Sequence, residues 1–202
     1  AALAIEARDR RLANETLRRR DAMLDSMRFA SEQFLRAEAW TDCIGGVLRH
    51  LGEALGTSRI YVFENGCRDD GAILTSQRFE WVAAGITPQI DNPALQDVCY
   101  EEVGFGHWAE ALAQGQAVTT TATTMTPSER ALLEKQQILS LLAVPVFVGT
   151  TGWGFIGFDD CRVEHDWLPA EVDSLKAVAD GLGAAIQKQQ AQEEALRAKE
   201  DA

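Results

Sequence analysis

Residues 140–160 read SLLAVPVFVGTTGWGFIGFDD, and this stretch decides which fold the chain adopts. It is rich in β-branched and aromatic residues, which favour strands. Gly149-Thr150-Thr151-Gly152 divides it in the middle and has the residue types of a tight hairpin turn. The sequence therefore predicts two long strands, at 138–149 and 152–161, joined as an antiparallel hairpin.

The second of these strands is apolar on both faces. Strict alternation gives one face Trp153, Phe155, Gly157 and Asp159, and the other face Gly154, Ile156, Phe158 and Asp160. We therefore expect helices to cover one face and a pocket or its lid to cover the other. Asp159 and Asp160 point to opposite faces, so they cannot share a metal ion without a bulge. One of them is expected to hydrogen-bond the turn before Trp167.

Shorter segments on either side complete an α+β pattern on an antiparallel sheet. Further strands are predicted at 59–65 (RIYVFEN), 78–85 (RFEWVAAG) and 116–122 (QAVTTTA). Between the last of these and the hairpin, a helix is predicted over 126–138. Thr126 is its N-cap, Pro127 takes the first helical position, and Glu129 completes a capping box.

Long helices are predicted at both ends. Residues 1–39 lack proline and glycine, and a second helical stretch ends at Gly56. The final helix begins at Leu168-Pro169 and is expected to leave the domain near Gln187. The first helix has an apolar stripe at Leu12, Thr16, Met23, Met27, Ala30 and Phe34, and the last has one at Leu175, Val178, Leu182, Ile186 and Leu196. The expected organisation is an N-terminal helix at 1–39, a domain at 40–187 and a C-terminal helical extension at 188–202.

Composition limits the function classes. The formal net charge of −12 over 202 residues argues against a nucleic-acid footprint. No apolar run approaches the ~20 residues of a membrane span. The four cysteines form no CxxC pair, so neither a zinc site nor a dithiol motif is indicated, and reduced thiols suggest the cytoplasm. The chain starts without methionine, so we expect a fragment of a longer protein.

Together, RIYVFEN, FEWVAAGITPQIDNP, the 129–161 segment and the W-x-x-x-E-V-x-x-L run from Trp167 to Leu175 resemble the GAF domains of bacterial sensor proteins such as histidine kinases and cyclases. The resemblance covers about residues 25–190. It implies a six-stranded antiparallel sheet with helices packed on one face, a loop-enclosed pocket on the other, and flanking signalling helices that build a parallel homodimer. It also implies an attached output domain outside this chain. The asparagine-lysine-phenylalanine-aspartate-glutamate signature of cyclic-nucleotide-binding members is missing.

The candidate binding residues gather around CYEEVGFGHW, residues 99–108. Its glycines allow close backbone approach, and its aromatic side chains supply flat apolar walls. With three residues from elsewhere, the predicted ligand-binding set is Trp81, Cys99, Tyr100, Phe105, His107, Trp108, Arg130 and Asp159. Trp81, Phe105 and Trp108 are expected to wall the pocket, and Arg130 to pair with an anionic group of the ligand. Ordinary core packing, or for Arg130 a surface ion pair, is the alternative explanation.

No cofactor or metal is expected. His107 could ligate haem iron and Cys99 could tether a bilin, but a lone histidine is more often structural, and the sequence around Cys99 does not match that of bilin-binding members. The leading hypothesis is a non-catalytic sensory module that binds a small molecule. The alternatives are a ligand-free dimerisation and relay domain, and a thiol enzyme resembling methionine sulfoxide reductases that would use Cys99 and Cys161.

Overall fold

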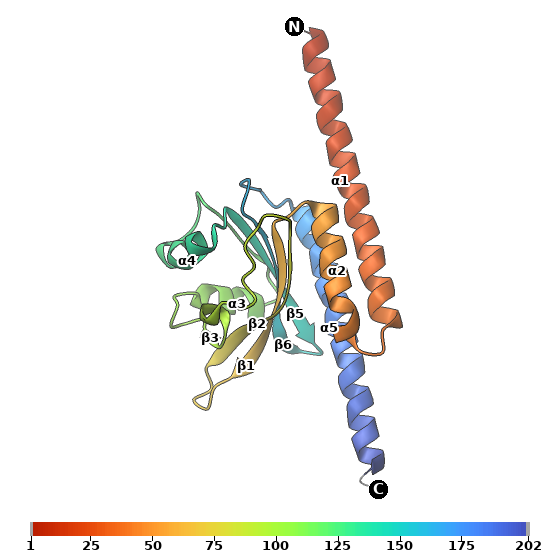
Figure 1. The fold of residues 1–202 in the computed structure, drawn as a ribbon, viewed down its shortest axis with the longest axis vertical. Coiled ribbons are helices and arrows are strands. Elements are labelled where there is room, and N and C mark those ends of the chain that lie inside the picture. Colours follow the sequence, from red (N-terminus) through yellow and green to blue (C-terminus); the bar gives the residue numbers. More distant parts are fainter. Residues whose placement is uncertain (1, 201–202) are drawn as a thin grey trace.

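The computed structural model describes residues 2–200, without the side chains of residues 2–9, 11–13, 15 and 16. Two long helices, α1 (Ala2–Arg36) and α5 (Pro169–Glu200), run along one side of a domain, with the N- and C-terminal ends at opposite extremes (Figure 1). The Leu12 and Thr16 positions of the predicted stripe lie outside the described side chains. Among the described residues, no helix is long and apolar enough to cross a membrane.

The domain is built on a six-stranded antiparallel sheet in the order β3-β2-β1-β6-β5-β4, which confirms the expected fold class. Its strands are β1 (Arg59–Cys67), β2 (Ile73–Val82), β3 (Val98–Cys99), β4 (Val118–Thr121), β5 (Ser140–Val148) and β6 (Thr151–Asp160). The predicted hairpin of residues 138–161 is β5 and β6, and β6 lies at the centre of the sheet beside β1.

Helices cover one face of the sheet, which we call the helix face. Together with α1 and α5, α2 (Trp40–Leu55) packs there and ends at Gly56, as predicted. The core of this face is mainly aliphatic, with members such as Ile44, Leu48, Leu51, Ile60, Val144, Ile156, Phe158, Leu175 and Leu182. This core includes Met23, Ala30 and Phe34 of α1, so much of the predicted stripe packs against the chain's own α2 and α5.

Short helices and loops cover the opposite face, which we call the cavity face. They are α3 (Gly106–Ala113), α4 (Pro127–Leu133), and the 3-10 turns η1 (Pro93–Leu95) and η2 (Glu134–Gln136). The capping box predicted at Thr126 and Glu129 is present at the start of α4. The helix predicted to reach residue 138 ends earlier, because Gln137 adopts a left-handed backbone at φ 61°.

Two β-bulges change which face certain residues take. Pairing of β1 with β2 jumps from Val62 opposite Phe79 to Phe63 opposite Gln77, so Arg78 is the extra residue. In β6 the extra residue is Trp153. A bulge breaks the two-residue alternation. Trp153 therefore packs in the helix-face core, and the prediction that it shares a face with Phe155 is wrong.

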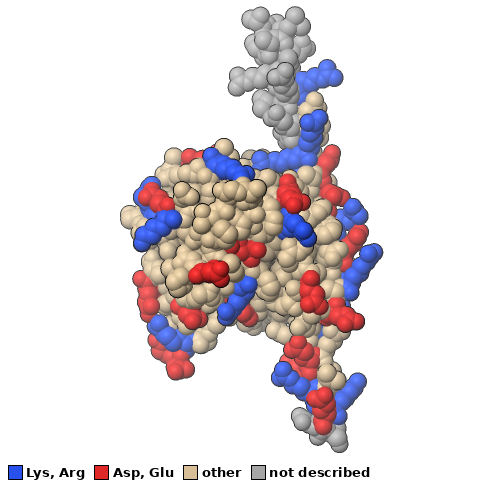
Figure 2. All heavy atoms as spheres, viewed as in Figure 1, with Lys and Arg blue, Asp and Glu red and all other residues tan. Residues whose placement is uncertain are grey.

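Charged side chains of both signs are interspersed around the domain and along the lower end of α5, in the view of Figure 2. Acidic and basic residues alternate there without forming a broad basic surface on this side. On this side of the domain the acidic residues are therefore not gathered into one block.

Candidate functional site

A cavity of about 60 Å³ lies between the sheet and the cover of the cavity face. It is lined by Arg59, Tyr61, Phe63, Thr75, Gln77, Glu80, Gln89, Leu95, Val98, Tyr100, Val103, Phe105, Trp108, Leu132, Leu133, Gln136, Ile138, Leu141 and Phe155. Strands β1, β2, β5 and β6 form its floor, and the segment from η1 through α3 and α4 forms its roof. The volume corresponds to roughly four to six water-sized positions.

Aromatic side chains form most of the apolar wall. Phe63 and Phe155 stack with ring centroids 4.8 Å apart, and Phe105 lies 4.9 Å from Trp108. Tyr61 packs across β6 at Gly157, where a Cβ atom would collide with its ring. The wall is therefore partly made possible by the absence of a side chain at Gly157.

Two buried polar side chains in the cavity wall have no hydrogen-bond partner. Gln77 is 3% exposed, and both its amide nitrogen and its amide oxygen are unpartnered. The hydroxyl of Thr75, 4% exposed, is also without one. Each such group carries a desolvation cost of about 1–3 kcal/mol, so native proteins contain few of them. Thr75 and Gln77 lie on the same face of β2, so these unpaired groups are next to each other.

Tyr100 closes the cavity near Thr75. Burial raises the pKa of Tyr100 to about 12, so its phenol is protonated at neutral pH. Its hydroxyl lies 3.5 Å from the Oδ1 atom of Asn65. The nearby Thr75 hydroxyl opposes this rise in the pKa of Tyr100, although no well-formed hydrogen bond joins the two groups.

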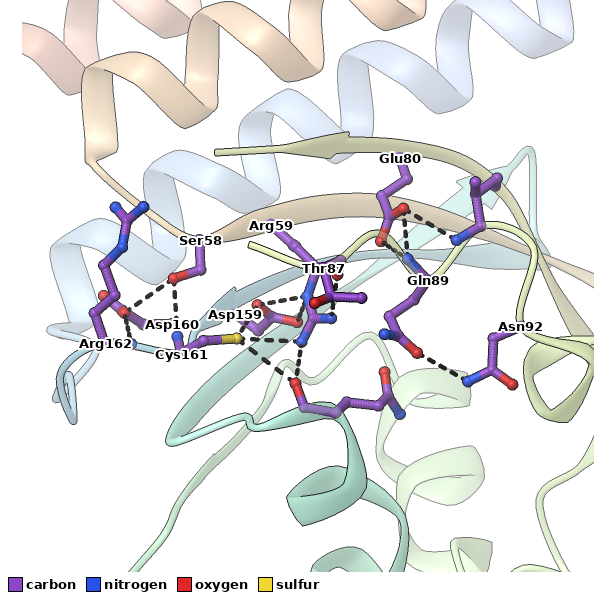
Figure 3. Close-up of polar contacts among 12 residues, drawn as sticks. Ser58, Arg59, Glu80, Thr87, Gln89, Asn92, Asp159, Asp160, Cys161 and Arg162 are labelled. Atoms are coloured by element: carbon purple, nitrogen blue, oxygen red, sulfur yellow. Dashed lines mark hydrogen bonds and ion pairs between the residues drawn. The ribbon is translucent and has the colours of Figure 1, made fainter. Parts of the chain in front are cut away.

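A buried ion pair lies at the other end of the cavity (Figure 3). Arg59 is 1% exposed, and its Nε atom donates to the Asp159 carboxylate at 3.0 and 3.2 Å. The remaining guanidinium contacts are to the carbonyls of Thr87 and Gln136 and to the Cys161 sulfur. Burial raises the pKa of Asp159 to about 7, and the Arg59 charge opposes that rise. Arg59 thus ties the sheet to the loops that cover the cavity.

Glu80 and Cys161 flank this ion pair. The Glu80 carboxylate accepts hydrogen bonds from the backbone N–H groups of Gln89 and Ile90 at 2.9–3.0 Å, which holds the loop after β2 over the cavity (Figure 3). Burial, together with the charge of Asp159, raises the pKa of the Cys161 thiol to about 11. This thiol is therefore protonated at neutral pH and is a poor nucleophile.

The chain that follows Asp159 connects the cavity to the long helices. The Asp160 carboxylate accepts from the backbone N–H groups of Arg162 and Val163 at 2.8 and 3.2 Å, as expected for one of the two aspartates. Farther on, His165 contacts both Arg19 of α1 and Glu171 of α5, at 2.8 and 3.3 Å. Arg19 and Glu171 also form an ion pair with each other.

Glu129 joins two helices of the cavity roof. Besides closing the capping box of α4, its carboxylate accepts from Trp108 Nε1 at 2.7 Å and contacts His107 Nε2 at 3.2 Å. Burial acts to raise the pKa of Glu129, but hydrogen bonds from the Thr126 backbone, Trp108 and His107 outweigh it, so the pKa is lowered. The carboxylate stays charged and fixes the indole of Trp108 in the roof.

The structure brings together only part of the predicted site. Tyr100, Phe105 and Trp108 line the cavity, and Asp159 lies directly behind Arg59. Trp81 does not line the cavity, so the prediction that it forms part of the cavity wall is wrong. The bulge at Arg78 turns it to the helix face, where it packs over Gly52 of α2.

Three other predicted residues lie outside the cavity lining. Cys99 is buried in the edge strand β3, His107 is half-exposed, and Arg130 pairs with Glu134 at 2.7 Å on the surface. The thiols of Cys99 and Cys161 lie toward opposite ends of β1. Cys99 pairs with Leu74, the β2 residue opposite Gly66, whereas Cys161 comes two residues after Asp159, which is opposite Arg59. That separation is roughly 20 Å along the strand, so the two thiols cannot react with each other in this conformation.

A family model described as GAF domain matches residues 41–186. The chain belongs to the GAF domain family. This GAF domain is 36% identical over 197 residues to the methanogenesis regulatory histidine kinase FilI of Methanothrix harundinacea, covering 98% of this chain and 22% of the relative. The chain thus spans about a fifth of the length of that relative.

Two solved structures of similar fold are distant from this chain in sequence. The far-red-absorbing dark state of one protein, with bound biliverdin IXa, gives a TM-score of 0.69 at 17% identity and covers 82% of this chain and 99% of that one. The blue-light-absorbing form of the PixJ GAF domain of Thermosynechococcus elongatus gives 0.62 at 20% identity, covering 87% and 95%. At these identities the likeness establishes the shared fold of this GAF domain.

Sequence reasoning missed Arg59, Thr75, Gln77 and Glu80 as cavity residues. For Arg59 a signal existed, because a basic residue opens one predicted strand and an acidic residue closes another. In antiparallel neighbours these two ends meet. Gln77 gave no comparable signal, because ILTSQ mixes polar residues on both faces and does not resemble a half-buried strand. Among the described residues, no cluster of three or more His, Cys, Asp or Glu could hold a metal ion.

Proposed function

We propose that this GAF domain is a sensory module that binds a small molecule in the cavity and signals occupancy through α1 and α5, without catalysing a reaction. The observation that carries the proposal is the position of residues 159–171. Their first residue holds the cavity arginine, and their last ones contact both long helices. A change at the cavity therefore has a short covalent and hydrogen-bonded path to the helices.

The proposed signal starts at Arg59. Its guanidinium contacts the loop after β2, the end of η2 and the end of β6, so a ligand that moves it must also shift Asp159. Asp160 and the turn after it then move His165 relative to Arg19 and Glu171. A ligand can change the helices only if it binds two arrangements with different affinity.

The same proposal covers the longer protein. Because a histidine kinase is 36% identical over nearly the whole of this chain, we infer that the domain regulates an attached output domain of a signalling protein, of the histidine kinase type. The long helices α1 and α5 extend away from the domain at opposite ends, which suits a connecting role (Figure 1). We also place the protein in the cytoplasm.

A parallel homodimer through the terminal helices forms part of the proposal, with one change from the sequence-based expectation. Met23, Ala30 and Phe34 are already buried against the chain's own helices, so they cannot form the dimer interface. Leu17, Leu24 and Leu35 of α1 remain 58%, 53% and 77% exposed. These three leucines lie on one side of α1. The 18 residues from Leu17 to Leu35 make five full turns, and the seven from Leu17 to Leu24 make nearly two. This outer stripe is the surface we assign to the second copy.

A ligand-free relay is the second candidate. It is favoured by the size of the cavity, which at about 60 Å³ is far below the roughly 300–1,000 Å³ of ordinary ligand pockets. The domain's own Phe63, Phe105 and Trp108 fill much of the space above the sheet. In that case the helices would exchange signals through the packed domain without a bound molecule.

Tetrapyrroles are a separate question, because one of the similar structures holds biliverdin. We propose that this chain carries neither bilin nor haem. Cys99 and His107 both lie outside the cavity lining, and the cavity volume suits a much smaller guest. A visible absorption spectrum of the purified protein tests this, since a Soret or bilin band would overturn it.

The sensory proposal is tested by hydrogen exchange in α1 and α5 of the complete chain. Native mass spectrometry and a thermal-shift screen first identify a retained or stabilising compound. We expect that compound to change exchange of the amides around Arg19 and Glu171. His165→Ala should abolish the change, whereas His50→Ala, which alters a histidine stacked on Phe29 away from the path, should preserve it.

Two results contradict the sensory proposal in different ways. If a compound binds in the cavity without changing hydrogen exchange in either helix, the domain binds a ligand but does not signal through α1 and α5. If no compound is retained or stabilises the protein, the ligand-free relay is the better explanation.

A further inference from the structure

Among the described residues, Gln77 is the buried side chain that has both a donor nitrogen and an acceptor oxygen without a partner. Gln77 lines the cavity and is only 3% exposed. Its planar amide carries a donor and an acceptor, and neither has a protein partner. A primary amide of this kind pairs best with another planar group that offers an acceptor beside a donor. The amide edge is therefore a recognition surface whose partner has matching chemistry.

The charges around the cavity exclude an anionic partner. Arg59 is the only cationic side chain of the lining in the described chain, and Asp159 holds it at 3.0 Å. Glu80 adds a negative charge to the lining, with its carboxylate turned to the backbone N–H groups of Gln89 and Ile90. The cavity and its immediate surroundings thus have no excess positive charge to bind a carboxylate or phosphate.

Size and the remaining walls narrow the partner further. The roughly four to six water-sized positions admit a molecule of a few non-hydrogen atoms. Phe105, Trp108 and Leu133 supply an apolar surface opposite the sheet, and the unpartnered Thr75 hydroxyl adds one donor or acceptor beside Gln77.

We propose that the cavity selects a small neutral molecule with an amide-type edge, such as a primary amide or a urea, and that Gln77 reads this edge by paired hydrogen bonds. This inference rests on the proposed sensory function and names its ligand class. A buried group that is satisfied only by ligand explains why the chain tolerates its desolvation cost. A site of this kind strongly rejects analogues that lack the matching donor.

Acetamide, acetone and acetate test the proposal, because the three have the same number of non-hydrogen atoms. Acetone lacks the donor, and acetate is charged. Each is titrated into the complete 202-residue chain and followed by NMR. The indole proton of Trp108, which is hydrogen-bonded to Glu129, reports occupancy of the cavity by any probe. The side-chain amide protons of Gln77 report recognition of the amide edge.

We expect acetamide to bind at least about tenfold more tightly than acetone or acetate, the difference that one satisfied polar pair supplies. Gln77→Leu should reduce this preference to about twofold or less. It should fold normally and melt at the same or a higher temperature, because it removes an unpaired buried group. Gln116→Leu, the same change at an exposed glutamine, should keep the wild-type preference.

Any other result contradicts either the ligand class, the role of Gln77 or the ligand-binding function itself. If all three probes shift the Trp108 indole with equal affinity, the ligand class is wrong while the sensory cavity stands. A preference for acetate would also overturn the class. Long-lived water on the Gln77 amide that acetamide does not displace would make the group structural. If no probe shifts the Trp108 indole, the cavity admits no small molecule, and both this inference and the ligand-binding function fail.

Discussion

The two faces of the sheet differ in how their side chains pack. On the helix face, aliphatic side chains from α1, α2 and α5 interlock with β1, β5 and β6, and the core is continuous. On the cavity face, aromatic rings surround the cavity, and Gln77 and Thr75 are buried without protein partners. Voids and unpaired polar groups both reduce stability. The helix face therefore supplies the stability that lets the cavity face keep features suited to binding.

The largest expected effect comes from two tryptophans on opposite faces. Trp108→Ala should destabilise the domain by about 3–5 kcal/mol, because it empties a buried site and leaves the Glu129 carboxylate without its indole donor. Trp81→Ala should cost less, since Trp81 is only half-buried. Chemical denaturation measures both changes. Only the Trp108 variant should alter probe binding, and equal effects of the two on binding would end the distinction between the faces.

A pH-dependent effect is expected at the boundary between the faces. Burial raises the pKa of Asp159 to about 7, well above its value in an unfolded chain near 3.8. Between these values the folded state binds more protons than the unfolded state, so stability falls as pH rises from about 4 to about 7, by at most ~1.4 kcal/mol per pH unit.

Comparing denaturation of the wild type with Asp159→Asn across that range isolates the effect. The variant should be less stable overall, because it breaks the ion pair with Arg59. Its stability should nevertheless depend less on pH between 4 and 7. Parallel pH curves for the two proteins would mean that Asp159 is charged throughout.

The exposed stripe of Leu17, Leu24 and Leu35 on α1 is the proposed dimer interface. Leu24→Glu should weaken the proposed dimer at least about tenfold, since it places a charge in an apolar stripe. Light scattering over a concentration series measures the dissociation constant. Ile73→Glu changes an equally exposed apolar residue at the start of β2 and should have no effect. A monomeric wild type would remove the dimer from the proposal.

The smallest effect is expected at Arg130. Its ion pair with Glu134 spans one turn at the end of α4, and both side chains are largely exposed. Arg130→Ala should cost no more than about 0.5 kcal/mol by denaturation and leave acetamide binding unchanged. Loss of binding in this variant would restore the original expectation that Arg130 contacts a ligand.

Much of the fold was predictable because its signals are local. The hairpin of residues 138–161 follows from residue types that favour strands around a Gly-Thr-Thr-Gly turn, and the capping box of α4 lies within four residues. Gly56 ends α2 by the same kind of short-range preference. The strand of residues 73–82 was predicted five residues short at its start, because its first half is polar on both faces.

The amino-acid sequence by itself determined the order of the longer strands and helices, the family resemblance, the long terminal helices and the aromatic segment of residues 99–108 that roofs the cavity, but not the short edge strand β3. Only the tertiary structure decided that Trp81 and Trp153 belong to the helix face, that Arg59 meets Asp159, and that Gln77 is buried without a partner. The physical reason is range. A turn or a helix cap is set by neighbours within a few residues, whereas a bulge or a buried unpaired amide depends on pairing between strands far apart in the chain.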